Sequence, residues 1–284
     1  MHLPSEEEIQ RIVCSALAED VGSGDVTTLA TVPETSVAAA KMVAREPMVV
    51  SGLDIAIKAF ATVSADLQFE KVITDGARVE NGAVLLRISG SARALLTGER
   101  VTLNFVQRLS GIATLTAQFV EAVKGTRAKI LDTRKTTPGL RLLEKYAVAC
   151  GGGQNHRIGL FDMILIKDNH LVALRNEPPN AIEAAVRRAR EKFPLLKVEV
   201  EADKPLQVEQ ALLAGADVIL LDNMTLDEMR AAVVFVNGRA KTEASGGVNL
   251  ITVRAIAETG VDFISVGAIT HSARAVDIGL DFEL

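Results

Sequence analysis

The sequence predicts an α/β protein whose larger part is an incomplete parallel barrel. Six short apolar, β-prone runs follow one another in the second half of the chain, at residues 129–133, 162–167, 196–201, 217–222, 240–245 and 262–267. They are separated mostly by helix-forming stretches and recur about every 20 to 35 residues, which is the spacing expected for right-handed βαβ units that build a parallel sheet. Because a complete barrel has eight strands, we expect an incomplete or irregular α/β barrel, with a doubly wound open sheet as the alternative.

The first part of the chain predicts a helix followed by a small antiparallel sheet. Ser5 and Glu8 form a capping box ahead of apolar residues at helical spacing. Residues 36–90 then change to short β-prone runs, broken by the turn signals Asp75-Gly76 and Asn81-Gly82.

A long helical region follows from about Leu95 and resumes after Gly111 as far as Val123, and later helices are expected to stop at Gly215 and Gly260.

Composition excludes several classes of protein. The 284 residues are 48% hydrophobic, enough for a large core in one large domain or in one medium and one small domain. The net charge of −5 and the 4% of aromatic residues argue against a general nucleic-acid binder. Cys14 and Cys150 lie far apart, without the spacing of a disulfide framework or zinc site. With neither a signal core nor a membrane-span-length run, we expect a cytoplasmic protein with no membrane partner.

Polar residues recur where the six strands end, and the C-terminal face of an α/β barrel carries its active site. Lys167 ends one of these strands, and four further basic residues are nearby in sequence: Arg134, Lys135, His156 and Arg157. Cations that share one face repel one another unless an anion neutralises them, which favours a pocket for a polyanionic substrate. Lys167 alone would also suit a Schiff-base nucleophile or an ordinary rim residue.

Acidic residues occupy the same faces. Glu199 and Glu201 alternate with valines, so both point to one side of their strand, and a structural salt bridge to Lys or Arg is the preferred interpretation of Glu199. Glu201 and Asp222 end successive strands and predict a pair of ligands for a divalent metal, since Mg²⁺ needs only one or two carboxylates beside substrate phosphates.

Glycines follow the two last strands. Ser245-Gly246-Gly247 and Val266-Gly267-Ala268 each lead from a strand toward a helix, the first toward a helix expected near Asn249, and such loops bind phosphate. Gly151-Gly152-Gly153 lacks the spacing of a dinucleotide fingerprint and is interpreted as a flexible loop, with Cys150 before it as a buried structural residue.

These residues together resemble the quinolinate phosphoribosyltransferases, the decarboxylating enzymes of NAD synthesis, nearly end to end. The similar segments are 19–28, 98–104, 132–141, 144–170, 198–201, 220–223 and 243–248. The most specific are the run TRKTTPG from Thr133 and the pattern HR-x-GL-x-D from His156.

The resemblance implies a fold and an assembly. The fold is an N-terminal α/β sandwich domain over residues 1–107, to which the tail 276–284 returns, and an irregular α/β barrel of the type II phosphoribosyltransferase kind over residues 108–275. The assembly is a homodimer, or a higher oligomer, with shared active sites in which Arg100 reaches into the neighbouring subunit's pocket.

The resemblance also implies roles for single residues. Arg134, His156, Arg157 and Lys167 match residues around the two carboxylates of quinolinate, and Lys135, Lys167, Glu201 and Asp222 are the expected catalytic group. Residues matching those that hold phosphoribosyl pyrophosphate and its Mg²⁺ are Lys135, Glu201, Asp222, Ser245, Gly246, Gly247, Val266, Gly267 and Ala268, and Thr133 is a further expected substrate-binding residue.

The implied activity is a pentosyl transfer from phosphoribosyl pyrophosphate to quinolinate with decarboxylation, giving nicotinate mononucleotide, pyrophosphate and CO₂. Two enzymatic alternatives stay open: a phosphoribosyltransferase of the same fold with another acceptor, and a lysine-dependent barrel aldolase supported by Lys167 alone. A non-catalytic anion-binding dimer is the third alternative.

Overall fold

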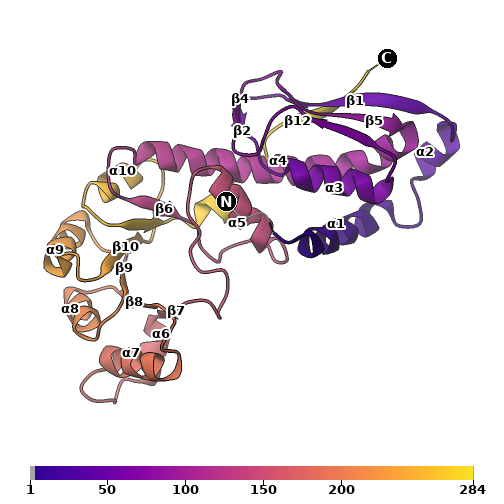
Figure 1. Cartoon of the computed structure of the whole chain (residues 1–284). Coiled ribbons are helices and arrows are strands. Elements are labelled where there is room, and N and C mark those ends of the chain that lie inside the picture. Colours follow the sequence, from indigo (N-terminus) through magenta and orange to yellow (C-terminus); the bar gives the residue numbers. More distant parts are fainter. Residues whose placement is uncertain (1–3, 284) are drawn as a thin grey trace. The chain divides into compact units, whose positions relative to one another are not determined.

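The chain forms two compact units (Figure 1), and the computed structural model describes residues 4–283. The first unit comprises the residues up to Ala117, Thr136–Gly152 and the residues from Ile269 on, and the second comprises Gln118–Lys135 and Gly153–Ala268. Helix α4, Ala92–Ala122, continues through the expected domain boundary at residues 107 and 108 and belongs to both units.

The first unit begins with the predicted helix. Helix α1, Glu6–Val21, starts with the expected capping box, in which the backbone N–H of Glu8 donates to Ser5 Oγ at 3.3 Å and the N–H of Ser5 donates to Glu8 Oε2 at 3.2 Å. Its buried face packs on helix α3, Leu53–Val63. Helix α3 interrupts the stretch expected to be entirely β, since Leu53, Ala56 and Phe60 repeat at helical spacing and bury one face.

Two antiparallel sheets complete the β structure of the first unit. One has the strand order β12, β1, β5, β3, and the other pairs β2 with β4. The strands are β1 Val37–Ala44, β2 Met48–Val49, β3 Gln68–Lys71, β4 Arg78–Val79, β5 Val84–Ser91 and β12 Ile278–Glu283. The remaining helices of this unit are α2 Val26–Thr31, α5 Arg141–Cys150 and α11 Ala268–His271. The first residue of α11, Ala268, is still counted with the second unit. The small antiparallel sheet predicted from residues 36–90 is therefore confirmed, with the last strand of the chain at its edge.

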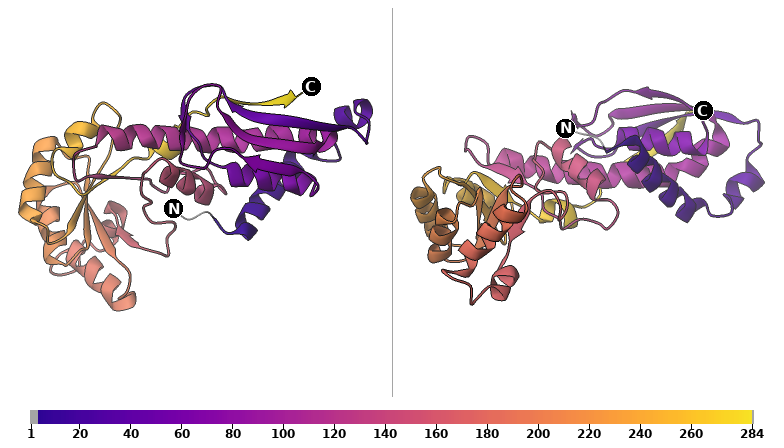
Figure 2. Two further views of the ribbon diagram at one scale, coloured as in Figure 1. Left: turned by 45° about the horizontal axis from the view of Figure 1, so that its top comes forward. Right: turned by 60° about the horizontal axis from the view of Figure 1, so that its bottom comes forward.

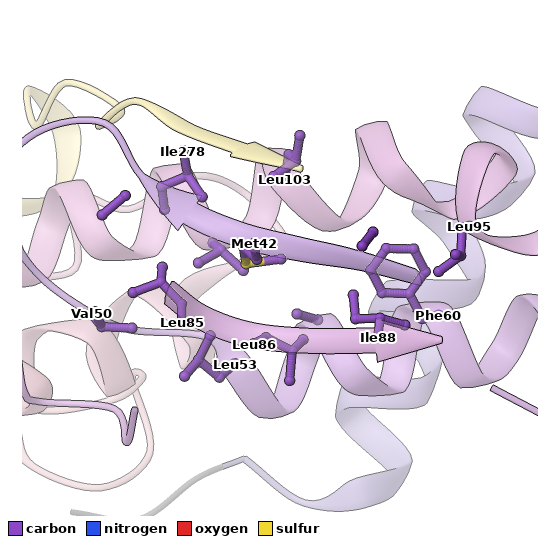
Figure 3. Close-up of a cluster of buried hydrophobic side chains, with 14 of the residues drawn as sticks. Met42, Val50, Leu53, Phe60, Leu85, Leu86, Ile88, Leu95, Leu103 and Ile278 are labelled. Carbon is purple, nitrogen blue, oxygen red and sulfur yellow. The ribbon is translucent and has the colours of Figure 1, made fainter. Parts of the chain in front are cut away.

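The hydrophobic core of the first unit lies between this sheet and its helices (Figure 3). Met42 of β1 and Leu86 of β5 are fully buried together with Phe60 of α3 and Leu95 of α4. Each side chain of this size contributes about 1.5–3 kcal/mol when it is removed from water. Ile278 of β12 belongs to the same cluster, so the C-terminal strand is part of this core.

A buried ion pair fixes the segment before α5 in the first unit. Glu144 is fully buried and accepts from Arg108 Nη2 at 3.0 Å, from the backbone N–H of Thr137 at 3.1 Å and from Thr137 Oγ1 at 2.7 Å. Arg108 Nη1 also donates to the carbonyl of Ala273 at 2.7 Å. One carboxylate therefore holds both α4 and the turn that precedes α5.

Gly111 does not interrupt α4, contrary to the expectation from sequence. A Cβ at this position would lie 2.0 Å from the carbonyl oxygen of Arg274, so glycine permits close approach of two backbone segments. The predicted glycine stops are present elsewhere, with φ of +80° at Gly215 and +90° at Gly260.

The second unit contains one parallel sheet of the six predicted strands, in the order β6, β11, β10, β9, β8, β7. The strands are β6 Lys129–Leu131, β7 Ile164–Ile166, β8 Val198–Ala202, β9 Val218–Asp222, β10 Lys241–Ser245 and β11 Phe263–Ser265; the helices are α6 Asp168–Ala173, α7 Ala181–Lys192, α8 Pro205–Leu213, α9 Leu226–Val236 and α10 Val253–Ala257. Helix α10 starts four residues after the expected Asn249, whose side chain instead accepts from the N–H groups of Ile251 and Thr252 and holds a turn.

The strand order confirms an incomplete barrel. From β7 to β11 each strand lies beside its predecessor in sequence, and β6 follows β11, so the sheet winds in one direction around the unit and is not doubly wound. Within residues 4–283, β6 and β7 do not pair, which leaves the barrel open between them. Helices α7 to α10 pack against the strands, as Figure 2 shows. No helix in this described range is long and apolar enough to cross a membrane.

Candidate active site

The predicted site residues of the second unit gather at the C-terminal ends of its parallel strands. Residues 132–135 follow β6, Lys167 follows β7, Glu201 and Asp222 lie at the ends of β8 and β9, and residues 245–247 close β10. Parallel strands end at the same edge of a sheet, so these groups share one face.

A short segment fills part of the gap beside β6. Gln154 donates its N–H to the carbonyl of Ile130 at 2.8 Å and accepts from the N–H of Asp132 at 3.1 Å, so it extends β6 by a single bridge. Asp132 is fully buried, and its Oδ1 accepts from the N–H of His156 at 2.8 Å. This arrangement sets the position of Arg157, the next residue.

Two arginines lie partly buried at this edge, Arg134 after β6 and Arg157 in the following loop. Burial lowers the pKa of Arg157, the positive charge of Arg134 lowers it further, and the negative charges of Glu199 and Asp162 oppose the shift. Arg157 Nη1 donates to the carbonyl of Met163 at 3.2 Å. Two guanidinium groups that repel each other in a partly buried place are an arrangement that an anion would stabilise.

The acidic pair lies beside a lysine. Lys167 Nζ lies 2.7 Å from Glu201 Oε2, and Asp222 Oδ2 accepts from Asn223 Nδ2 at 2.7 Å. Burial raises the pKa of Asp222, and the charge of Glu201 raises it further, whereas Lys167 and Lys135 oppose the shift. The two carboxylates therefore repel each other, and Lys135, exposed in the loop after β6, contributes positive charge to the same place.

The loop after β10 has the backbone form that only glycine adopts readily. Gly246 has a φ of +97° and Gly247 a φ of +61°, and a Cβ on Gly246 would lie 2.1 Å from Asn223 Oδ1. The N–H of Asn223 donates to the carbonyl of Ser245 at 3.0 Å, which joins this loop to the end of β9.

The next loop, residues 266–268, is anchored in the same way. The N–H of Val266 donates to the carbonyl of Leu131 at 2.9 Å, so the loop joins the end of β6, and Ala268 begins α11. Thr133 lies in the neighbouring loop, where its Oγ1 accepts from the N–H of Lys135 at 3.1 Å.

A buried polar cluster lies on the strands before their ends. His156 Nε2 lies 3.0 Å from Glu199 Oε2 and 3.6 Å from Glu243 Oε2, and Glu199 and Glu243 are 0% and 2% exposed. The partner of Glu199 is thus a histidine, where a Lys or Arg was expected.

Glu243 belongs to this cluster but was not among the residues predicted from the sequence. It precedes Ser245 by two residues, as Glu199 precedes Glu201, and this alternation was the available signal for an inward-facing side chain. Burial raises the pKa of Glu243 to about 8, and the charge of Glu199 adds to this effect.

Two further predicted residues lie in the first unit. Arg100 is exposed on α4, and its side chain makes no hydrogen bond or ion pair with any residue in the range 4–283. Cys150 is buried at the end of α5, as expected, and burial raises the pKa of its thiol to about 11, so it is protonated at neutral pH.

Comparisons with known proteins find similarity over nearly the whole chain. A family model described as the N-terminal domain of quinolinate phosphoribosyl transferase matches residues 25–110, and one described as its C-terminal domain matches residues 112–281. A protein of Mycobacterium leprae named nicotinate-nucleotide pyrophosphorylase [carboxylating] is 47% identical over 272 residues, which are 94% of each chain.

Solved structures are similar over the whole chain. The structure of NadC from Streptococcus pyogenes has a TM-score of 0.94 and 40% identity and covers 100% of both chains. The nicotinate-nucleotide pyrophosphorylase of Francisella tularensis has a TM-score of 0.93 and 39% identity and covers 98% of this chain and 97% of its own.

Proposed function

The chain belongs to the quinolinate phosphoribosyltransferase family, and on that premise we infer that it transfers the phosphoribosyl group of phosphoribosyl pyrophosphate to quinolinate in NAD biosynthesis. The products are nicotinate mononucleotide, pyrophosphate and CO₂. The observation that carries this function is the collection of Arg134, Lys135, Arg157 and Lys167 at one edge of the parallel sheet of an acidic protein. Both substrates are polyanions, and this edge offers the fixed positive charge that they require.

Quinolinate binding is assigned to the β6 and β7 side of this edge. Arg134, Arg157 and Lys167 supply donors for two carboxylates, with His156 beside Arg157 in the same loop. The guanidinium of Arg157 makes one hydrogen bond, to Met163, among the described residues, so further N–H groups of its fork are free for a carboxylate.

Phosphoribosyl pyrophosphate is assigned to the other side. The loops Ser245-Gly246-Gly247 and Val266-Gly267-Ala268 support binding of its 5′-phosphate through backbone N–H groups, while Thr133 and Lys135 contribute a hydroxyl and a charge.

Glu201 and Asp222 suit Mg²⁺ because they offer hard carboxylate oxygens on neighbouring strands, and because burial and the charge of Glu201 raise the pKa of Asp222, an effect that a bound cation would oppose. When bound, Mg²⁺ would neutralise charge on the pyrophosphate oxygens. The lysine ion pair already orients Glu201 at the end of β8.

The reaction needs no covalent bond to the protein. The ring nitrogen of quinolinate forms a bond to ribose C1 while the bond from C1 to the pyrophosphate oxygen breaks, and pyrophosphate leaves with that electron pair. The ring nitrogen is then cationic and stabilises the electron pair left on the adjacent carbon when its carboxylate departs as CO₂; a proton then fills that position. The protein contributes positioning and electrostatic stabilisation, through Arg134, Arg157, Lys135 and Lys167.

A homodimer with shared sites is part of the proposal. Arg100 supports it, because this exposed arginine on α4 has no partner among residues 4–283 and would serve as an additional cation for the pocket of a second copy. Mixing an Arg100→Ala variant with an inactive Arg134→Ala variant should then restore activity, because one hybrid site contains both arginines. Absence of complementation in mixed dimers would contradict sharing.

The function is tested by mixing the protein with Mg²⁺, quinolinate and phosphoribosyl pyrophosphate and measuring nicotinate mononucleotide, pyrophosphate and CO₂. Formation of all three in equal amounts is expected. Product formation from nicotinate in place of quinolinate would identify a related enzyme with another acceptor. Borohydride treatment in the presence of substrate separates the aldolase alternative, since a trapped adduct on Lys167 would reveal a Schiff base.

A further inference from the structure

Asn223, which follows Asp222 at the end of β9, has a backbone conformation that is unusual for a residue with a side chain. Its φ is +55°, and Asn237, with a φ of +46°, is the other non-glycine residue with a positive φ in the range 4–283. This left-handed region is sterically costly for a residue with a Cβ, although asparagine enters it more readily than most residues. Such a conformation at the edge of a site needs a physical reason.

The two asparagines differ in what their backbone conformation achieves. Asn237 ends helix α9, where its N–H donates to the carbonyl of Val233 at 3.0 Å, and a left-handed residue is a common way to end a helix. Asn223 ends no helix, because it follows a strand. Its side chain is exposed, so packing in a hydrophobic core does not explain its conformation either.

The link that contains Asn223 is short and is held at its far end. It consists of residues 223–225, between β9 and α9. Met224 is buried, and Thr225 caps α9 through a capping box with Glu228. The backbone of Asn223 therefore has little freedom, and its side chain is held beside the end of β9.

The side chain of Asn223 holds one oxygen of Asp222. Asn223 Nδ2 donates to Asp222 Oδ2 at 2.7 Å. A carboxylate accepts hydrogen bonds and does not donate them, so the amide must present its nitrogen, and not its oxygen, to Asp222. Within residues 4–283 the carboxylate of Asp222 accepts no other hydrogen bond, which leaves its Oδ1 for a ligand.

Asn223 also contacts the loop after β10. Its N–H donates to the carbonyl of Ser245 at 3.0 Å, and Ser245 is the register partner of Asp222 in the pairing of β10 with β9. A Cβ on Gly246 would lie 2.1 Å from Asn223 Oδ1 and 2.6 Å from its Cγ, so the amide packs directly against the backbone of Gly246. One side chain thus contacts both the acid and the glycine loop.

Glu201, the other acid of the proposed Mg²⁺ pair, is held in a similar way. Lys167 Nζ lies 2.7 Å from Glu201 Oε2, and no other residue in the range 4–283 donates to that carboxylate. Each acid of the pair therefore has one oxygen held by a neighbouring side chain and one oxygen without a protein donor. Groups that orient a carboxylate ligand in this way act on metal affinity, and their removal typically costs about 10- to 100-fold.

We propose that Asn223 is a positioning residue, which holds Asp222 in place for Mg²⁺ with its amide nitrogen and seats the loop Ser245-Gly246-Gly247 beside the same acid with the rest of its amide. The proposal rests on the proposed function for the identity of the metal and of the phosphoribosyl donor. In this role Asn223 acts through Asp222 and Gly246, so that the metal and the phosphate bind at adjacent places.

Two substitutions separate the side chain of Asn223 from its backbone. Asn223→Gly removes the amide but keeps a residue that adopts a positive φ freely, whereas Asn223→Ala removes the amide and adds backbone strain. Asn237→Gly and Asn237→Ala make the same changes at the end of α9 and are the matched controls. If Asn223 served only the backbone, Asn223→Gly would behave like the wild type.

Binding of Mn²⁺, measured by electron paramagnetic resonance with phosphoribosyl pyrophosphate present and quinolinate absent, reports on the site without turnover. The dissociation constant should rise about tenfold or more in both Asn223 variants, and it should change little in both Asn237 variants. In steady-state kinetics the KM for phosphoribosyl pyrophosphate should rise in the Asn223 variants. The KM for quinolinate should change little, because quinolinate is assigned to the β6 and β7 side of the edge.

A double-mutant cycle in stability tests the contact with Gly246 and uses no ligand. Gly246→Ala should lower the urea midpoint of the wild type more than that of Asn223→Gly, because the second background lacks the side-chain atoms that the new Cβ would meet. Part of the loss remains in both backgrounds, since the positive φ of Gly246 strains an alanine in either one.

Three results would overturn the proposal. They are the absence of Mn²⁺ binding by the wild type, a wild-type affinity for Mn²⁺ in Asn223→Gly, and equal effects of Gly246→Ala in the two backgrounds.

Product formation by the wild type decides the proposed function separately. If the wild type forms nicotinate mononucleotide while Asn223→Gly binds Mn²⁺ normally, the role of Asn223 fails and the function stands. If Asn223→Gly loses affinity for Mn²⁺ and the wild type forms no product from quinolinate, the role of Asn223 stands and the proposed acceptor fails.

Discussion

Lys167 Nζ and Glu201 Oε2 lie 2.7 Å apart and join the ends of β7 and β8, two neighbouring strands of the open barrel. The lysine side chain is 45% exposed and the glutamate side chain is 14% exposed. Glu201 is therefore the more constrained member of the pair, because neighbouring residues surround most of its side chain. The pair gives the site a fixed boundary between the cations assigned to quinolinate and the carboxylates assigned to Mg²⁺.

Glu201→Gln should lower kcat by about 100-fold, the order of effect when one electrostatic group is removed at a reacting centre. The substitution removes both the partner of Lys167 and one of the two carboxylates proposed for Mg²⁺. Steady-state kinetics at increasing Mg²⁺ would also show a higher concentration for half-maximal rate. The exposed Glu209→Gln variant serves as the control, and equal kinetics in the two variants would exclude Glu201 from the site.

Gly246→Ala should destabilise the protein by about 1–3 kcal/mol and raise the KM for phosphoribosyl pyrophosphate. Its φ is +97° and a Cβ would meet Asn223 Oδ1 at 2.1 Å, so the loop after β10 must move. Gly238→Ala is the matched control, since its φ is +73° but no atom lies within 4 Å of a Cβ there. Urea unfolding and initial rates measure the two effects, and a KM increase of the same size in both variants would contradict a local role of the loop.

Glu243→Gln should flatten the pH dependence of stability. The folded protein keeps the proton of Glu243 up to about pH 8, whereas the unfolded chain loses it near pH 4.5. Between these values the folded state binds more protons, so this contribution to the free energy of unfolding is complete below about pH 4.5 and is lost as pH rises toward 8. Urea titrations across this window, with wild type and variant in parallel, measure the difference, and parallel curves would count against a protonated Glu243.

Glu144→Ala should destabilise the protein by about 3–5 kcal/mol, because it leaves the charge of Arg108 without its buried partner. It also removes the acceptor of both donors of Thr137. Glu6→Ala breaks the exposed ion pair with Lys58 and should cost under about 1 kcal/mol. Thermal and urea unfolding measure the loss of stability in the two variants. Similar decreases in the free energy of unfolding would mean that the buried ion pair of Glu144 stabilises the protein no more than an exposed pair does.

Local patterns in the sequence were sufficient to predict the strands of the second unit and the polar residues at the ends of those strands. The alternation around Glu201 and the apolar run before Lys167 depend on neighbours within a few residues, so they could be identified without a structure. The capping box of Ser5 and Glu8 is equally local.

Long-range contacts explain what the sequence did not predict. Gly111 breaks no helix because its role is the approach of Arg274, which is more than 160 residues away. Glu243 meets Glu199 and His156 only when the sheet has formed with β9 between β8 and β10. Residues 136–152 join the first unit although strands of the second unit precede and follow them, and no composition change marks that return.

The pairing of β12 with β1 constrains the order in which the protein matures during synthesis. Strand β1 leaves the ribosome early, but its antiparallel neighbour β12 and the core residue Ile278 follow every strand of the second unit in the sequence. The second unit, by contrast, receives its six strands from consecutive segments. Translation therefore supplies all six strands of the second unit before β12, and the N-terminal sheet keeps an unpaired edge beside β1 until β12 has been synthesised.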